Sequence, residues 1–358
     1  MNKIIFLALS LSFIIADINI SGDARIRPRL DIKDNGGDYG ASSTDLYYLY
    51  RARLNINADI GDGWFFKSKI GTNDVASIVK MGVEGTFAYA TGSSMSSAGN
   101  SNSARPRLSF LNLYYGFKKD NFGFWGGAIP ISHNSALDIH FYPNKIVDVP
   151  FLLWNNASTT GFAGYVYKLN WFISIDDNNT EIDETYTTDD EITYTKVTAK
   201  SIDPFTIGMD FPMKWNDYLD IHARGLFSMT DKAEPGPMTL GLDMKIIEIF
   251  KVKPTFSYYY STQFTGEDNK YDITHLRAKV KFMNLTFWTD MAQHIDKSTN
   301  IAETTDLTYI WIDYTHKLFS SDMGSISIKP TIRYQMGEVG NPDYSRMKLE
   351  LTTGIKFK

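Results

Sequence analysis

The side chains in this chain best suited to interact with solutes are basic residues spaced two positions apart. Arg25, Arg27 and Arg29 alternate with other residue types, and Arg51 and Arg53 repeat the spacing. In an extended strand, residues i and i+2 point to the same side, so each run lines one face with guanidinium groups. A guanidinium stays charged and offers five hydrogen-bond donors. The spacing predicts a polar surface that acts on solutes through charge.

Other chemistries are poorly represented. The chain has no cysteine, which excludes thiolate metal sites, cysteine nucleophiles and redox pairs. Its glycines form neither a Walker motif nor a dinucleotide-binding motif, and its histidines lie on different expected elements without metalloprotease spacing. The histidines are His133, His140, His222, His275, His294 and His316. We therefore expect no metal, no cofactor and no enzyme. A membrane-embedded esterase or phospholipase with a Ser-His-acid or Ser-His-Asn cluster remains open, because a triad is a spatial arrangement that sequence spacing cannot show.

Charge and the N-terminal segment point to export. The formal charge of -5 over 358 residues does not suit a nucleic-acid partner. Lys3 precedes a 13-residue apolar run that ends at Ala16, and this pattern predicts a cleaved signal peptide over residues 1–16. We expect residues 17–358 to form one domain. No later window approaches the roughly 20 apolar residues of a membrane helix.

The sequence around the basic residues predicts long strands. Residues 17–32 place apolar side chains on even positions and polar ones on odd positions, and residues 46–60 repeat the pattern. Strict alternation predicts β-structure with one apolar face and one polar face. Strands in globular proteins average about five or six residues, whereas a tilted membrane-spanning strand needs roughly 9–11. The length favours membrane strands.

The same pattern continues through the chain and predicts an antiparallel barrel of about 16 strands. The remaining predicted strands are 64–72, 107–117, 122–129, 158–167, 171–176, 205–213, 218–229, 238–246, 251–260, 271–282, 285–291, 307–316, 325–335 and 344–357. Short connections such as 61–63 and 283–284 alternate with long ones such as 73–106 and 261–270, as periplasmic turns and external loops do. Residues 191–201 are also strand-like. We place them in the fourth long loop or in an extension of the eighth strand, and a total of 18 strands stays possible.

A sheet in lipid must be closed and must turn its apolar face outward, so the polar faces share one lumen. The candidate pore-lining residues are Arg25, Arg27, Arg29, Arg51, Arg53, Lys67, Lys69, Arg224, Arg277, Lys279, Lys329, Arg333, Arg346 and Lys348. Aromatic residues near strand ends are candidates for girdles at the membrane interfaces. These are Tyr47, Tyr48, Tyr50, Trp64, Phe65, Tyr114, Tyr115, Trp171, Trp215, Trp288 and Trp311.

With its signal peptide, two-faced strands, alternating connections and the ending Ile355-x-Phe357, the mature chain resembles a Gram-negative outer-membrane porin. The resemblance implies a homotrimer in outer-membrane lipid, with a third long loop, 130–157, that folds into the lumen. The implied constriction residues on this loop are Asp138, His140, Lys145 and Asp148, and they would oppose Arg25, Arg27, Arg29, Arg51 and Arg53. Opposed charges across a narrow aqueous eyelet filter solutes by charge and hydration.

We expect a water-filled channel for passive diffusion of small hydrophilic solutes or ions. The alternative is a barrel with a plugged lumen that serves adhesion or surface binding through its loops. Ion preference stays open at this point, because the basic wall favours anions whereas the acidic tract 176–191 favours cations.

Overall fold

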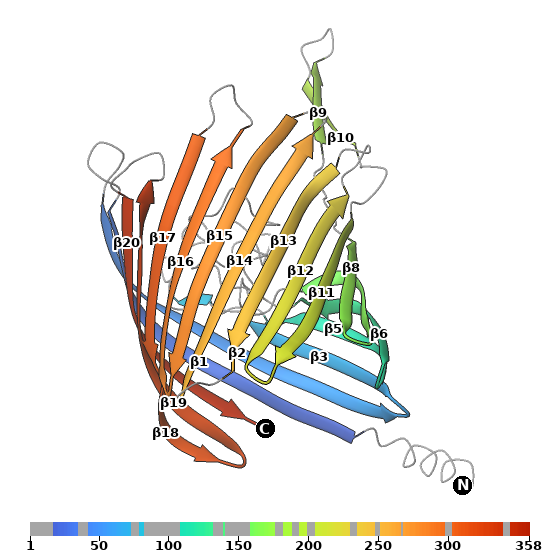
Figure 1. Ribbon diagram of the computed structural model, residues 1–358, viewed down its shortest axis with the longest axis vertical. Helices are drawn as coiled ribbons and strands as arrows, with labels where there is room; N and C mark the ends of the chain where they lie inside the picture. Colours follow the sequence, from blue (N-terminus) through green and yellow to red (C-terminus); the bar gives the residue numbers. More distant parts are fainter. Residues whose placement is uncertain are drawn as a thin grey trace.

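The chain folds into an all-β structure dominated by one closed sheet (Figure 1). The computed structural model describes residues 17–34, 42–72, 79–81, 108–131, 139, 158–175, 182–187, 193–198, 205–229, 235–247, 251–265, 268–297, 303–338 and 344–358. The predicted signal peptide lies outside the described residues. No helix in the part that is described is long and apolar enough to cross a bilayer.

The strands follow one another along the chain as the alternation predicts. They are β1(Asp17–Asp34), β2(Ser43–Gly61), β3(Trp64–Thr72), β4(Val79–Met81), β5(Leu108–Lys119), β6(Phe122–Pro130), β7(Ser158–Val166), β8(Leu169–Ile175), β9(Ile182–Thr187), β10(Thr193–Thr198), β11(Phe205–Asn216), β12(Leu219–Met229), β13(Pro235–Ile246), β14(Val252–Thr265), β15(Asp268–Phe282), β16(Leu285–Asp296), β17(Glu303–Tyr314), β18(His316–Ser321), β19(Gly324–Glu338) and β20(Tyr344–Phe357).

The main sheet is a ring of 16 antiparallel spans. Its first and last strands pair with each other, β1 with β20, so the sheet has no free edge there. The main sheet contains 18 strands by hydrogen bonding, but β17 and β18 are two pieces of one span that both pair with β19, and β4 is a three-residue piece beside β2. The prediction of a 16-stranded barrel is confirmed.

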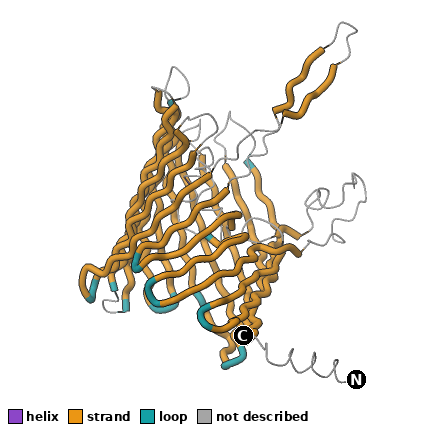
Figure 2. Tube along the Cα trace, turned by 90° about the vertical axis from the view of Figure 1, so that its right-hand side faces the viewer, coloured by secondary structure: helices purple, strands orange, loops and turns teal. Residues whose placement is uncertain are grey.

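The strand-like segment at residues 191–201 does not add a span. It supplies β10, which pairs with β9 in a separate two-stranded hairpin between β8 and β11. Strands β8 and β11 pair directly, so the barrel closes without the hairpin. The hairpin stands beyond the rim of the barrel, at the end opposite to the chain termini (Figures 1 and 2).

Tight turns join the strands at the end of the barrel where the chain termini lie (Figure 1). Residues Asp62 and Gly63 connect β2 to β3, and Met283 and Asn284 connect β15 to β16. Gly63 has φ +91°, and a Cβ there would collide with the carbonyl oxygen of Lys118, so the turn needs a glycine. The connections at the other end are mostly longer, as predicted. The predicted loop 261–270 is wrong, because β14 continues to Thr265 and β15 begins at Asp268.

Strand length differs around the ring. Strands β1, β2, β19 and β20 have 18, 19, 15 and 14 residues, whereas β6, β7 and β8 have 9, 9 and 7. A nine-residue strand tilted by about 40° reaches roughly 23 Å along the barrel axis, close to the ~25 Å apolar band of outer-membrane barrels. A 14-residue strand reaches roughly 35 Å by the same estimate. The barrel therefore has a tall side and a short side.

Candidate functional site: the inner face of the barrel

Successive residues of each strand point alternately outward and into the ring. On β1, Ile18, Ile20 and Ile26 are more than half exposed, whereas Asp23 and Arg27 on the opposite face are 7% exposed. The exposed apolar face is the one that suits lipid, and the charged face is the inner one. The predicted pore-lining residues fall on the inner face of their strands and form several groups around acidic partners.

The first group forms around Asp23 of β1. Arg51 of β2 donates two hydrogen bonds to Oδ2 of this carboxylate, at 3.0 and 2.7 Å. Arg53 donates to Oδ1 at 2.7 Å, and Arg25 lies 3.7 Å from the same carboxylate. Because β1 and β2 pair in register at these positions, the three arginines stand around one acid. One carboxylate thus partly neutralises three guanidinium groups.

A second group forms around Glu350 of β20, whose side chain is fully buried. Arg29 approaches Oε1 of Glu350 at 2.5 Å, and Arg333 of β19 donates to Oε2 at 2.8 Å. Arg27 lies 3.6 Å from Glu350 and donates to the hydroxyl of Thr352 at 2.8 Å. Pairing of β1 with β20 therefore closes the barrel and also joins charges that lie far apart in the sequence.

Asp31 organises the third group, nearest the long-loop end. Arg346 donates two hydrogen bonds to its two oxygens, at 2.8 and 2.9 Å. The Tyr47 hydroxyl donates to Asp31 at 2.9 Å, and Lys348 lies 3.8 Å away. We call the inner face of β1, β2, β19 and β20, which holds these three groups, the basic wall.

Next to the basic wall, ions and rings are interleaved. Trp288 and Trp311 stack with ring centroids 4.1 Å apart, and the guanidinium of Arg333 lies 3.7 Å from the Trp311 ring. The two indoles are 7% and 4% exposed on the inner face, so the girdle role considered for them is wrong. Asp290 and Asp313 follow Trp288 and Trp311 by two residues on the same strands, so they lie on the same inner face. Among the described residues of this region, Arg277 pairs with Asp290 at 2.5 Å and Lys329 with Asp313 at 3.1 Å.

Opposite in character is the inner face of β3, β5, β6, β7 and β8, which we call the aromatic wall. Its rings belong to Phe65, Tyr114, Trp125, Tyr165 and Phe172. Phe65 contacts Tyr114 edge to face at 6.0 Å, and Trp125 contacts Tyr165 at 6.2 Å. Lys67 and Lys118 lie 5.6 and 4.9 Å from the Phe65 ring. Phe65 and Tyr114 were girdle candidates, and their inward position corrects that interpretation as well.

The remaining predicted residues have less crowded surroundings. Arg224 of β12 lies between Asp210 and Asp243, at 3.4 and 3.0 Å. Lys279 lies 5.0 Å from the Trp288 ring, and Lys69 stands on β3 beside Asn55 of β2. The acids that hold the basic groups were not singled out from the sequence. Their position on the polar face of each strand was the signal that could have found them.

Beyond Ile131, the third long loop is described at one residue, Ile139. Its side chain is fully buried, in an apolar cluster formed by inner-face residues of β12 and of β14 to β17. Those residues are Leu226, Tyr259, Tyr271, Ile273, Ala292 and Leu307. Ile139 therefore lies inside the barrel, against the wall. The predicted constriction residues Asp138, His140, Lys145 and Asp148 lie outside the described residues.

The described histidines and acids do not form a metal site. Within the described part of the chain, no group of three His, Cys, Asp or Glu side chains is placed to hold an ion. His275 lies 3.3 Å from Asp290, and His222 lies 3.4 Å from Asp210. What the inner face offers is a set of fixed charges and aromatic rings along a lumen, which can attract, orient and reject solutes.

A closed 16-stranded antiparallel barrel with an apolar exterior and a charged interior has the fold of the outer-membrane porins, and the predicted resemblance is confirmed for the fold. Salmonella typhi OmpF, in a complex with daunomycin, is similar with TM-score 0.53 and 10% identity over 95% of this chain and 98% of that one. An anion-selective porin from Comamonas acidovorans gives TM-score 0.53 and 9% identity over 96% and 100%. A loop-deletion mutant of OmpT, an outer-membrane protein of Vibrio cholerae, gives 0.51 and 8% over 94% and 99%. No protein-family model and no curated protein sequence matches the chain.

Proposed function

We propose that this chain forms a water-filled channel for passive diffusion of small hydrophilic solutes and ions across the outer membrane of a Gram-negative bacterium. The observation that carries the proposal is that inner-face charges keep solvent-accessible surface although the sheet is closed. The side chains of Arg25 and Lys329 are each 31% exposed, and that of Arg346 is 23% exposed. A plugged lumen would bury such groups in protein, which is costly for charges.

The channel prefers anions on this proposal. Basic residues outnumber acidic ones on the basic wall, and Asp23, Asp31 and Glu350 are each already engaged by two or three cations. The basic residues are Arg25, Arg27, Arg29, Lys33, Arg51, Arg53, Lys329, Arg333, Arg346, Lys348 and Lys356, against Asp17, Asp23, Asp31, Asp45, Asp59 and Glu350. A surplus of fixed positive charge in an aqueous passage raises the local concentration of anions.

The homotrimer is part of the same proposal. On the outer face of the short side, Phe124 stacks on Phe162 with centroids 5.6 Å apart and contacts Trp171 at 6.3 Å. This side barely covers the apolar band of the membrane. Packing against other copies through this flat apolar surface would take it out of lipid. The chain is exported with a signal peptide, residues 1–16, that is then removed.

Planar-bilayer recording of the purified, folded protein tests the channel. We expect discrete conductance steps. In a potassium chloride gradient, we expect a reversal potential whose sign shows selectivity for chloride over potassium. Protein that is folded but gives no conductance would rule out the channel and leave the plugged barrel. Hydrolysis of a short-chain ester by the same protein would instead favour the esterase alternative, because the proposed channel carries out no covalent step.

A further inference from the structure

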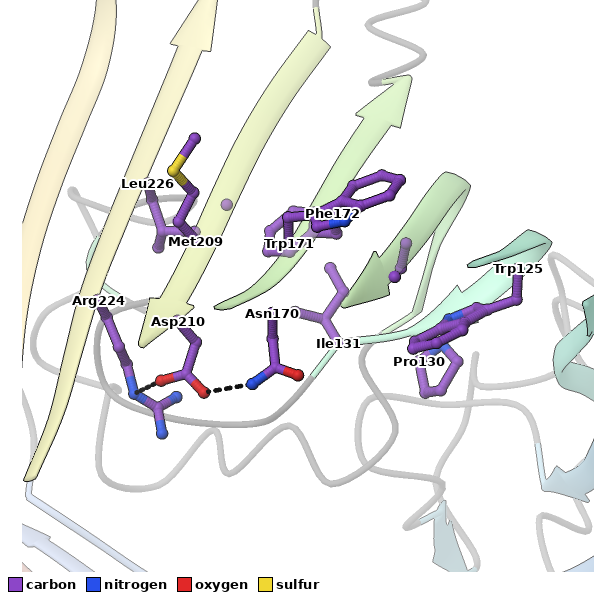
Figure 3. Close-up of a pocket in the computed structure, with 13 residues that line it drawn as sticks. Trp125, Pro130, Ile131, Asn170, Trp171, Phe172, Met209, Asp210, Arg224 and Leu226 are labelled. Atoms are coloured by element: carbon purple, nitrogen blue, oxygen red, sulfur yellow. Dashed lines mark hydrogen bonds and ion pairs between the residues drawn. The ribbon is translucent and has the colours of Figure 1, made fainter. Parts of the chain in front are cut away.

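A pocket of about 280 Å³ opens on the inner face of the barrel where β6, β7, β8, β11 and β12 lie side by side (Figure 3). We call it the niche. Three polar side chains, Asn170, Asp210 and Arg224, lie together at one side of it, and Trp125 lies at the other. Its volume is at the lower end for small-molecule sites, so it fits one small ring.

The apolar part of the niche consists of rings and aliphatic groups. Phe172 lies on the inner face of β8 and Trp125 on that of β6, with Pro130 and Ile131 between them in Figure 3. Ile131 and Phe172 also pack against the cluster that contains Ile139. The niche is thus built into the place where the third loop leaves the wall and meets it again.

Glycine makes the position of Phe172 possible. Gly208 of β11 pairs with Phe172 of β8, and a Cβ at residue 208 would collide with the Phe172 ring. The ring therefore lies over a stretch of bare backbone and forms part of a flat surface. Such a surface suits a ligand with an apolar face of its own.

The polar part is loosely connected and can bind further partners. Asn170 approaches Asp210 at 3.4 Å, and Arg224 approaches Asp210 at 3.4 Å. Both contacts are long, and an ionised carboxylate can accept about four hydrogen bonds. The Asn170 side chain is exposed, and the Arg224 side chain keeps 17% of its surface exposed although its Nε is buried between Asp210 and Asp243. Ligand hydroxyl groups could both donate to Asp210 and accept from Arg224 and Asn170.

The charges at the niche differ in sign from those of the basic wall. Arg224 lies between two carboxylates, Asp210 at 3.4 Å and Asp243 at 3.0 Å. Two acids against one guanidinium leave no surplus of positive charge to hold an anion. The niche therefore gives an anion no electrostatic advantage over a neutral ligand.

From this geometry we propose that the niche is a binding subsite for a neutral pyranose sugar. The C–H face of the sugar ring packs on Trp125 and Phe172, and its hydroxyl groups bind Asp210, Asn170 and Arg224. The inference rests on the proposed channel function, because the ligand reaches the niche through the lumen. It adds that the channel passes neutral sugars by saturable binding along one wall while anions are attracted to the other.

The test uses the folded full-length barrel in planar bilayers, with glucose as the probe. We expect glucose to lower the single-channel potassium chloride conductance saturably, with a midpoint in the millimolar range. Sorbitol has hydroxyl groups but no ring face, and we expect it to be much weaker. Trp125→Ala and Phe172→Ala should each raise the glucose midpoint about five-fold or more. Trp215→Ala is the matched control, since Trp215 is 76% exposed and does not line the niche.

Asn170→Ala keeps the test open if the aromatic variants fail to fold, because this side chain is exposed. We expect it to raise the glucose midpoint, because the amide that binds a sugar hydroxyl group is lost. Equal effects of glucose and sorbitol, or a response to benzylammonium ions in place of glucose, would overturn the sugar subsite. Conductance without any glucose effect refutes the subsite and leaves the channel standing. Glucose binding by calorimetry in a barrel that never conducts refutes the channel instead.

Discussion

The basic wall and the aromatic wall face the same lumen, yet they fill it by different means. On the basic wall, the single acids Asp23 and Glu350 each hold three arginines within 3.7 Å. On the aromatic wall, rings such as Trp125 and Tyr165 pack on one another, and lysines lie over their faces. Residues that face the lumen therefore need not belong to one chemical type. Long strands here bear charge, and short strands bear rings.

The difference has a physical reason in how each wall is held together. The carboxylates of Asp23, Asp31 and Glu350 link neighbouring strands, as Glu350 of β20 links to Arg29 of β1 and Arg333 of β19. Rings fill space without directional bonds, and glycines on neighbouring strands make room for them, as Gly123 does for Tyr165. The comparison predicts that the basic wall depends on individual charged groups and that the aromatic wall depends on shape.

Glu350→Gln tests whether the basic wall depends on a single charged group. The change leaves Arg27, Arg29 and Arg333 close together without their shared anion. Removal of one partner from a buried charge cluster costs about 3–5 kcal/mol. We expect the denaturant midpoint for unfolding of the barrel in lipid, measured by tryptophan fluorescence, to fall accordingly.

Glu303→Gln serves as the control for that experiment, because Glu303 is an exposed glutamate at the start of β17. Its midpoint should match that of the unaltered protein. If Glu350→Gln unfolds at the same denaturant concentration as Glu303→Gln, the three arginines do not need the carboxylate. The basic wall would then be no more dependent on single groups than the aromatic wall.

The outer faces of the two sides can be compared by adding a charge. Phe124→Lys puts an ammonium group on the outer face of the short side, where we propose that copies meet. Leu240→Lys puts one on β13, where Leu240 is 52% exposed on the outer face. A lysine facing lipid near the bilayer midplane costs about 2–4 kcal/mol. In detergent, native mass measurement should show Leu240→Lys as a trimer and Phe124→Lys as a monomer, whereas equal masses would contradict the assignment of the interface.

Gly208→Ala probes the dependence of the niche on shape. The added methyl group displaces the Phe172 ring, and we expect the glucose midpoint to rise about three- to five-fold, corresponding to ~1 kcal/mol. Gly225→Ala on the neighbouring strand β12 is the control, because, apart from its chain neighbours, the nearest group to the added methyl would be the Leu240 side chain, at 3.8 Å. Conductance in salt alone should not change in either variant. A glucose midpoint that is equal in both variants would show that the ring position does not matter.

Alternation predicted all the spans of the barrel because the membrane imposes two different solvents on the two faces of each strand. The prediction failed where this contrast ends. Near the long-loop end of β14, polar residues such as Ser261, Thr262 and Gln263 follow one another in the sequence without apolar alternation, so the sequence of this strand resembles that of a loop. The hairpin β9–β10 shows the converse case, in which strand-like residues lie beyond the rim and carry no information about the barrel.

For the candidate site, the sequence predicted only which strand face each residue occupies, not which residues contact each other. Alternation placed Arg27 and Arg333 on the polar faces of their strands. Glu350 reaches both arginines only because the barrel closes by pairing β1 with β20, and the pattern of a single strand does not show that pairing. Trp288 shares the face of Asp290, so its parity contained the information that it points inward. Ile139 had no such pattern, although apolar residues on the inner face, among them Ile273, mark the surface that receives it.

The smallest expected effect compares the charges of the two regions by sign. Lys329→Gln removes a positive charge of the basic wall, where the side chain is 31% exposed, and Asp210→Asn removes a negative charge at the niche, where the side chain is 29% exposed. A unit charge about 8 Å from a permeating ion in water contributes roughly 0.5 kcal/mol, a factor of about two. The chloride-to-potassium permeability ratio, taken from the reversal potential, should therefore fall about two-fold in Lys329→Gln and rise by a similar factor in Asp210→Asn. Shifts of the same sign in both variants would mean that ions do not sense the two regions separately, whereas a shift in Lys329→Gln alone would place the ion path along the basic wall and leave the niche to neutral solutes.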